Sequence, residues 1–264
     1  VPSDLATLLL AERAAADGAG GLQDVRLVAT LRGGISGGTI DSMRAQVEAV
    51  ATDRSLRRTV TDPYALSPDR SAEPGIRQPA DAGPPTRTPD GRWTAPFVMA
   101  SFNTRIVRRS NALQGWGYGR GLRYAEVMGV GSGPVGAVSA VGVTAALASL
   151  VAAMSFSPTR TLLDRVLPAP GTGPSAETRE KGWFRMVVDA ETETGRRYRA
   201  TAGGPGDPGY AATAVMLGES ALALALDGDR LPARAGSLTP ATALGDVLVE
   251  RLRTAGHTYE VTPA

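Results

Sequence analysis

Apolar positions recur along this 264-residue chain with two periods, and the periods locate its helices and strands. Leu5, Leu8 and Leu9 follow a helical spacing that predicts a first helix over residues 2–16. The continuous apolar run at residues 25–31 predicts a buried strand, and a second helical stripe follows it. The same reasoning predicts helices over residues 39–51, 103–113, 208–226 and 240–255, and strands over residues 97–100, 122–130 and 259–262.

A β-hairpin is predicted where apolar and polar residues alternate over 182–191 and 196–202, with a turn at Glu193-Thr194-Gly195. The segment 208–226 is almost wholly apolar, so we expect a deeply buried helix there. No regular β–α–β repetition runs through the chain. The pattern therefore predicts an α+β fold, a mixed or antiparallel sheet with helices packed on it, forming one domain over residues 1–264.

Residues 52–94 break the periodic pattern with a long excursion that is rich in proline. Little periodicity accompanies its seven prolines, which are Pro63, Pro68, Pro74, Pro79, Pro84, Pro85 and Pro89. A loop of this length inside a domain is typically a lid or a binding loop, and the alternative is a surface segment without direct chemistry.

Residues 134–167 are predicted to form an uncharged helical segment. No residue from 127 to 159 is charged, and charged residues occur only in the last part of the segment, after residue 159. The part over 135–156 is long enough to cross a bilayer, although its Ala, Gly and Ser content makes insertion marginal. A membrane span, a buried helix, a lipid-facing helix and a helix at a dimer interface all remain open. Residues 159–167 are expected to continue as helix.

Composition excludes several classes of site. The chain has no cysteine and a single histidine, His257, which excludes thiolate and His-rich metal sites. A Ser-His triad is not supported, because this one histidine directly follows a predicted helix end. A net charge of +2 gives no support for nucleic-acid binding. The lack of cysteine favours a cytoplasmic location. Because the chain starts at Val1, we expect it to be the C-terminal part of a longer protein.

The most distinctive local feature is a glycine-rich joint between the strand at 25–31 and the helix that follows it. Gly33, Gly34, Gly37 and Gly38 lie in this joint. Glycines that precede a helix N-terminus can bring backbone N–H groups close to a phosphate, carboxylate or enolate oxygen. The alternative is a tight turn with Ser36 as the helix cap.

A second glycine-rich loop spans residues 203–209 and also precedes a helix. Neither loop matches the dinucleotide-binding GxGxxG pattern or a P-loop, so the sequence shows no complete nucleotide-binding domain. Tyr118 and Tyr210 lie beside glycine-rich stretches and are candidate proton donors, with core or cap roles as the alternative. Asn103 and Arg105 could hold an anionic or carbonyl group, or could belong to a solvated helix face.

Seven motifs occur in an order that resembles the saccharopine dehydrogenase-like oxidoreductases, and the closest resemblance is to their trans-acting enoyl reductase branch. The resemblance covers nearly the whole chain. The motifs are PSDL (2–5), GGISGGT (33–39), DPYAL (62–66), RRSNAL (108–113), GYGRGLRYAEVM (117–128), GPSAETREKGWF (173–184) and GDPGYAATAVMLGESAL (206–222).

This resemblance implies an N-terminal Rossmann domain that is absent from the chain and that would bind NADP or NAD. The chain would then be the substrate and dimerisation part of an NAD(P)H-dependent reductase. Similar enzymes reduce the C=C bond of an acyl chain delivered by a lipid or polyketide synthase. The expected partners are an acyl or lipid substrate, carried on a carrier protein, and a second copy in a homodimer. The apolar segment adds an expected peripheral membrane contact.

Site residues follow as a hypothesis from this resemblance. Ser36, Thr39 and Tyr118 would assist catalysis, and Gly33, Gly34, Gly37 and Gly38 would face the cofactor. Asn103, Arg105 and Tyr210 would contact the substrate. Two alternatives stay open. One is a non-catalytic lipid- or membrane-associated module that retains the fold. The other is an amino-acid dehydrogenase of the saccharopine type, which would need clustered cations for its dicarboxylic substrate.

Overall fold

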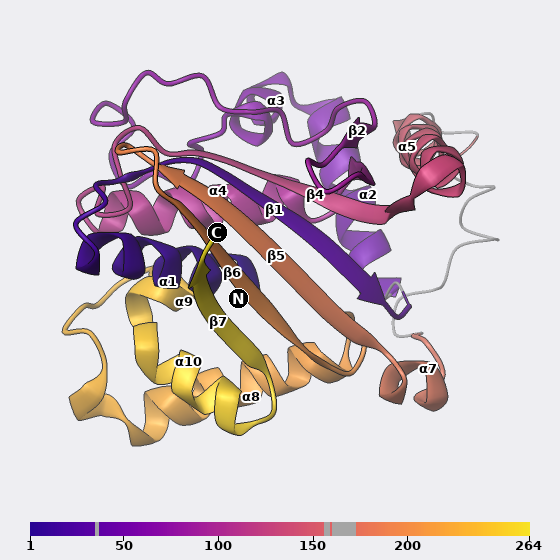
Figure 1. Ribbon diagram of the computed structural model, residues 1–264. Coiled ribbons are helices and arrows are strands. Elements are labelled where there is room, and N and C mark those ends of the chain that lie inside the picture. Colours follow the sequence, from indigo (N-terminus) through magenta and orange to yellow (C-terminus); the bar gives the residue numbers. More distant parts are fainter. Residues whose placement is uncertain (35–36, 156–158, 160–172) are drawn as a thin grey trace.

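The computed structural model describes residues 1–34, 37–155, 159 and 173–264 (Figure 1). These residues form a mixed sheet of seven strands in the order β2-β3-β4-β1-β5-β6-β7. The central strand β1 runs parallel to β4 on one side and antiparallel to β5 on the other. The strands are β1 (Leu22–Arg32), β2 (Thr86–Arg87), β3 (Arg92–Pro96), β4 (Arg123–Ser132), β5 (Trp183–Thr192), β6 (Arg197–Pro205) and β7 (Thr258–Pro263).

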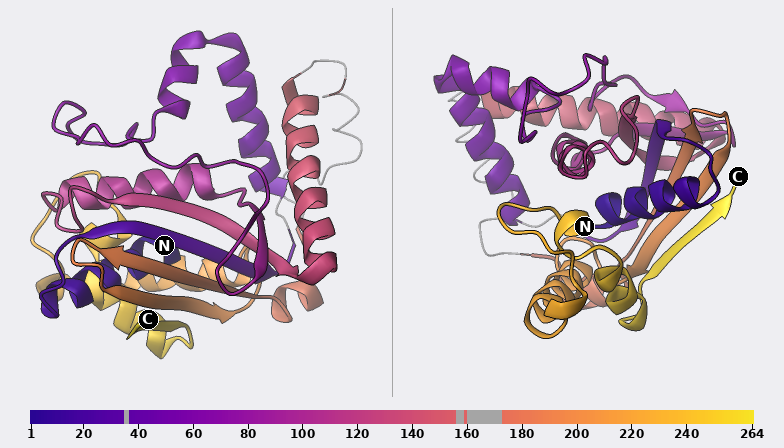
Figure 2. Two further views of the ribbon diagram at one scale, coloured as in Figure 1. Left: turned by 45° about the horizontal axis from the view of Figure 1, so that its top comes forward. Right: turned by 90° about the vertical axis from the view of Figure 1, so that its left-hand side faces the viewer.

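A layer of helices covers one face of this sheet (Figures 1 and 2). Val25, Leu27 and Ala29 of β1 point into the core that this layer forms with the sheet, because alternate residues of a strand face the same side. The helices of this layer are α1 (Pro2–Ala16), α4 (Ala100–Leu113), α8 (Ala211–Leu226), α9 (Pro240–Ala243) and α10 (Gly245–Thr254). The sheet with helices packed on it confirms the predicted α+β class.

Three more helices lie at the end of the sheet where β1 and β4 finish. The left view of Figure 2 shows α2 (Gly37–Thr52), α3 (Arg54–Thr61) and α5 (Gly133–Ser155) projecting from the sheet. α5 packs against α2, β3 and β4. The short helix α7 (Ala176–Glu180) precedes β5, and a 3₁₀ turn at Gly228–Arg230 follows α8. The predicted helix over 159–167 lies outside the described residues, apart from residue 159.

The strand predicted over residues 97–100 is wrong. The strand in this region is β3, which ends at Pro96, and the N–H of Ala100 already donates to the carbonyl of Phe97 in the turn that starts α4. Proline has no N–H to donate to a neighbouring strand, so Pro96 closes the strand earlier than the apolar run suggests. The predicted excursion at 52–94 also contains more order than expected, because α3, β2 and most of β3 lie within it.

The final helix is also different from the prediction. The expected helix over 240–255 is broken into α9 and α10 at Leu244 and Gly245, where the glycine takes a φ of +51°. A residue in this left-handed region interrupts helical hydrogen bonding. Thr239 caps α9, since its side chain accepts from the N–H of Thr242.

The deep burial predicted for the helix at 208–226 is wrong. Leu217, Leu224 and Leu226 of α8 are 70%, 61% and 69% exposed. Within this helix the buried residues are Ala212, Met216 and Ala223. α8 packs along α10 on one side, which leaves much of its apolar surface facing outward. A helix that is apolar on all sides does not by itself reveal how many of those sides are covered.

α5 is exposed in the same way. Val135, Val138 and Val141 are 78%, 74% and 60% exposed, whereas Gly136 and Ala140 are buried against the rest of the protein. Within the described residues α5 is the one helix that is long and apolar enough to span a membrane, with a mean hydropathy of 2.0. The structure therefore places this helix at the surface rather than in the core.

Candidate functional site

The two glycine-rich loops, which lie about 170 residues apart in the sequence, meet at the C-terminal end of β1. A Cβ atom placed on Gly33 would lie 2.7 Å from the Cβ of Asp207 and 3.1 Å from Cδ of Pro208. A Cβ on Gly34 would lie 2.6 Å from the Cβ of Pro174. Glycine is required at both positions, because a side chain on Gly33 would meet the second loop and one on Gly34 would meet Pro174. We call this meeting point the glycine junction.

Asp207 is the polar centre of the glycine junction and is fully buried. Its carboxylate accepts hydrogen bonds from the backbone N–H groups of Gly209, Tyr210 and Ala211 at 3.0–3.2 Å. Its own N–H donates to the carbonyl of Arg179. The carboxylate thus occupies the N–H groups at the start of α8. The second glycine loop is therefore closed by its own aspartate and does not present that helix end to an external anion.

Gly182 completes the glycine junction from the side of β5. Its carbonyl accepts a hydrogen bond from the N–H of Gly206 at 2.9 Å. A Cβ at this position would lie 2.5 Å from both N and Cα of Asp207. The sequence analysis missed Gly182. The available signal was its position directly before the first strand of the hairpin.

Tyr210 borders the glycine junction and is 36% exposed. A Cβ on Gly173 would come within 2.7 Å of its ring, so the chain passes close over the tyrosine. Of the predicted substrate contacts, Tyr210 is the one that the structure places beside the first glycine loop. Ser36 lies outside the described residues. Gly37, Gly38 and Thr39 open α2, directly after the junction, and the side chain of Thr39 is outside the described part.

Tyr118 lies far from the glycine junction. Its carbonyl accepts from the N–H of Leu22, at the opposite end of the 11-residue strand β1. At about 3.3 Å per residue, roughly 35 Å separate the two ends. The Tyr118 side chain is 2% exposed and its hydroxyl accepts from Gln114. Burial raises the pKa of Tyr118 well above its ordinary value. The structure therefore gives Tyr118 a place in the core and does not bring it together with Ser36 and Thr39.

Asn103 holds a buried carboxylate. Its Nδ2 donates to Oε2 of Glu126 at 2.8 Å, and the hydroxyl of Tyr124 donates to Oε1 at 2.8 Å. Glu126 is 2% exposed, and burial raises its pKa to about 7 although these hydrogen bonds oppose the shift. The sequence analysis missed Glu126. A single acidic residue within the predicted strand at 122–130 was the signal that could have found it.

Arg105 serves to anchor the proline-rich excursion. Its guanidinium forms an ion pair with Asp81 at 2.6 Å and donates to the carbonyls of Ser101 and Val60. Thr104 adds a hydrogen bond to the same aspartate. Because these partners are parts of the fold, the structure does not show Arg105 facing the glycine junction or an open binding surface.

Two further ionisable residues, Glu219 and His257, contact other parts of the fold. Glu219 pairs with Arg251 at 3.0 Å. His257 is buried with its ring edge against Phe184, and neither ring nitrogen has a hydrogen-bond partner among the described residues. Burial lowers the pKa of His257. No cluster of three or more potential metal ligands occurs within the residues described.

The packed side of the glycine junction does not fit a nicotinamide dinucleotide. The space where side chains of Gly33 and Gly34 would lie is filled by Asp207, Pro208 and Pro174, so it offers no room for a flat ring. The N–H groups at the start of α8 are already occupied by Asp207, so they provide no cradle for a pyrophosphate.

Similarity to known proteins comes from curated relatives. No protein-family model matches the chain, and no solved structure matches it. A Mycobacterium tuberculosis H37Rv protein provisionally named as a trans-acting enoyl reductase is 49% identical over 273 residues, which cover 99% of the chain and 65% of the relative. A trans-acting enoyl reductase of Mycobacterium bovis BCG is 45% identical over 97% of the chain and 63% of its own length.

A trans-acting enoyl reductase of Mycobacterium ulcerans is 43% identical over 99% of the chain. The chain spans 65% of the length of that relative as well, so each of the three proteins is longer than this chain. Over nearly its whole length, the chain is thus homologous to proteins named trans-acting enoyl reductase.

Proposed function

We propose that the chain is the substrate-binding part of an NAD(P)H-dependent enoyl reductase that reduces a C=C bond in a lipid or polyketide acyl chain. The observation that carries this proposal is the 49% identity, over 99% of the chain, to a relative named for enoyl reduction. The placement of α2 supports it, because this helix begins at Gly37, shortly after the end of the central strand.

In this proposal the bound NAD(P)H would supply the hydride that adds to the β-carbon of the enoyl group, and the resulting enolate would take a proton from water at its α-carbon. The N–H groups at the start of α2 and the hydroxyls of Ser36 and Thr39 stabilise the negative charge that develops on the thioester oxygen. Tyr210 borders the same space as a substrate contact. A carrier-protein partner, a homodimer and a cytoplasmic location are part of the proposal.

The direct test is NADPH oxidation by the purified full-length protein with enoyl thioesters of several chain lengths. We expect substrate-dependent oxidation and a saturated product that carries deuterium at the β-carbon when the cofactor is deuterated at the transferred position. Reduction of NAD(P)+ with saccharopine, and no oxidation of NADPH with any enoyl thioester, would instead support the amino-acid dehydrogenase. Absence of both activities in a protein that binds NADPH would overturn the reductase proposal.

Thr39→Val tests the proposed role of the α2 start. We expect kcat to fall about 100-fold, the usual effect of removing one donor to a developing oxyanion, with little change in KM. Steady-state kinetics and a melting curve check this together. Thr61→Val is the matched control, since Thr61 is exposed at the end of α3 and bonds only to its own helix. Unchanged kinetics in the Thr39 variant would remove this residue from the mechanism.

The exposed face of α5 favours a second candidate, a lipid- or membrane-associated role. Val135, Val138 and Val141 present apolar surface that no other described part of the protein covers. Such a face gains free energy when it enters the boundary between lipid headgroups and acyl chains. This role is compatible with the reductase and could also exist without catalysis.

Val138→Asp should weaken membrane association. We expect the wild-type protein to float with phosphatidylcholine–phosphatidylglycerol vesicles in a density gradient and the variant to stay largely in the soluble fractions. Leu217→Asp is the matched control, because Leu217 is exposed to a similar extent on α8, away from α5 (Figure 1). Equal flotation of the wild type and the Val138 variant would contradict the membrane role of α5.

A further inference from the structure

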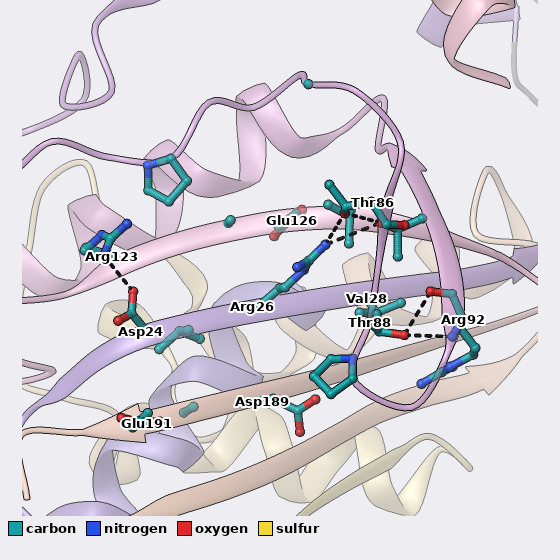
Figure 3. Close-up of a pocket in the computed structure, with 18 of the residues that line it drawn as sticks. Asp24, Arg26, Val28, Thr86, Thr88, Arg92, Arg123, Glu126, Asp189 and Glu191 are labelled. Atoms are coloured by element: carbon teal, nitrogen blue, oxygen red, sulfur yellow. Dashed lines mark hydrogen bonds and ion pairs between the residues drawn. The ribbon is translucent and has the colours of Figure 1, made fainter. Parts of the chain in front are cut away.

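The face of the sheet opposite the helices carries a pocket of about 780 Å³. We call it the trough. Its floor consists of residues from β1, β4, β5 and β6, and the proline-rich segment 79–92 passes over it (Figure 3). Pockets of this size accommodate small molecules. The trough lies along the middle and the first half of β1, whereas the glycine junction lies beyond the last residue of that strand.

The floor of the trough is apolar at its centre. Val28, Ala125 and Val127 line it from β1 and β4, and Pro79, Pro84 and Pro89 line it from the overlying segment. Burying alkyl groups against such surface contributes about 0.8 kcal/mol for each CH₂. Because the floor and the overlying segment are both apolar, the trough favours the flexible alkyl chain of a ligand over a polar metabolite.

Most of the charge that lines the trough is internally neutralised. Arg123 pairs with Asp24, Arg197 with Glu191, and Arg92 with Asp90, all at 2.8–3.3 Å. Arg199 holds Asp189 through both carboxylate oxygens, at 2.6 and 3.1 Å. These four arginines therefore have carboxylate partners within the lining itself.

Arg26 is different. It lies at the centre of β1, directly opposite Asp189 on β5, but both oxygens of that aspartate are bound by Arg199. The Arg26 Nη2 instead donates to the hydroxyls of Thr86 and Thr94, at 2.7 and 3.3 Å (Figure 3). Within the described residues no carboxylate lies within 4.0 Å of its guanidinium nitrogens, so its positive charge is uncompensated by a direct ion pair.

We propose that the trough binds an anionic amphiphile, with its carboxylate or phosphate head on Arg26 and its alkyl chain along the valine floor. A guanidinium with neutral oxygen partners retains donors for a planar anion, and such charge-assisted bonds are stronger where water is excluded. The proposal goes beyond enoyl reduction, because binding here requires neither a double bond nor a cofactor.

Calorimetric titration of the purified protein with dodecanoate and dodecyl phosphate tests the site, with dodecanol and acetate as probes that lack the head or the chain. We expect one site that binds an anionic probe, weaker binding of dodecanol and none of acetate. Preference between the two anionic probes identifies the head. No binding of either anionic probe up to its solubility limit would overturn the proposal.

Two variants separate the head from the chain. We expect Arg26→Gln to weaken binding of the preferred anionic probe at least ten-fold and to leave dodecanol unchanged, whereas Val28→Trp should block both by filling the floor. Arg185→Gln is the matched control, since Arg185 is an exposed arginine on the adjacent strand outside the trough lining. Equal binding by wild type and Arg26→Gln would refute the role of the guanidinium.

Photo-crosslinking supplies a measurement that does not depend on how the variants fold. A dodecanoate analogue with a diazirine on its chain should label peptides from β1, β4 and residues 79–92. Labelling confined to α5 would show instead that the alkyl chain binds the exposed helix and would contradict the trough. Because the assay needs no NADPH, failure of the reductase activity leaves this result unaffected.

Discussion

Gly182→Ala should lower the free energy of unfolding by about 3 kcal/mol or more, the upper range for a side chain forced into a packed region. The new methyl group would lie 2.5 Å from two backbone atoms of Asp207, and backbone cannot move aside as a flexible side chain can. Relief of the clash would separate the two glycine loops and break the bond between Gly206 and Gly182. Urea denaturation followed by circular dichroism measures the loss.

Gly218→Ala provides the contrast within the same protein. No atom lies within 4 Å of the position a Cβ would take on this residue of α8. Alanine is favoured over glycine in a helix interior by roughly 0.5–1 kcal/mol, so this variant should be slightly more stable than the wild type. Similar behaviour of the two variants would mean that the glycine junction is loosely packed and that its glycines are not required by close contact.

The difference in the free energy of unfolding between Glu126→Gln and the wild type should change by about 2–3 kcal/mol from pH 5 to pH 8. Burial raises the pKa of Glu126 from an ordinary 4.5 to about 7, so the folded protein retains a proton that the unfolded chain releases. Stability contributed by this proton is fully present below pH 4.5 and is lost as the pH rises towards 7. A shift of one pKa unit corresponds to about 1.4 kcal/mol.

The glutamine variant removes this titration. We expect it to gain stability relative to the wild type as the pH rises, and to show little or no gain at pH 5. Chemical denaturation at several pH values measures the difference. Glu177→Gln on α7 controls for the loss of a carboxylate, since Glu177 is exposed and pairs only with Lys181. A constant difference between Glu126→Gln and wild type across this range would show that Glu126 ionises normally.

Much of the fold could be predicted because its strongest patterns are local. The apolar run that became β1, the hairpin of β5 and β6, and the stripe of α1 each depend on residues close in sequence, and the structure confirms them. The burial of α8 could not be predicted in this way. Its apolar residues are uniform around the helix, so only the tertiary partner α10 decides which side is covered.

Less of the candidate site than of the fold could be predicted from the sequence. Each glycine loop was recognisable alone, but their contact through Gly33 and Asp207 depends on how β1, β5 and β6 align across the sheet. Asn103 and Arg105 looked like substrate contacts because short-range patterns do not reveal buried partners such as Glu126 and Asp81. The catalytic assignment of Ser36 and Thr39 stays a prediction.

The position of β1 at the centre of the sheet sets the order in which the protein can fold. β1 is made before both of its neighbours, β4 and β5, and β5 ends about 160 residues after β1. At synthesis rates of roughly 5–20 residues per second, β1 waits about 10–30 s for both partners. During that time its apolar edges are open to other chains. Production of this protein therefore depends on protecting one early strand until the hairpin emerges from the ribosome.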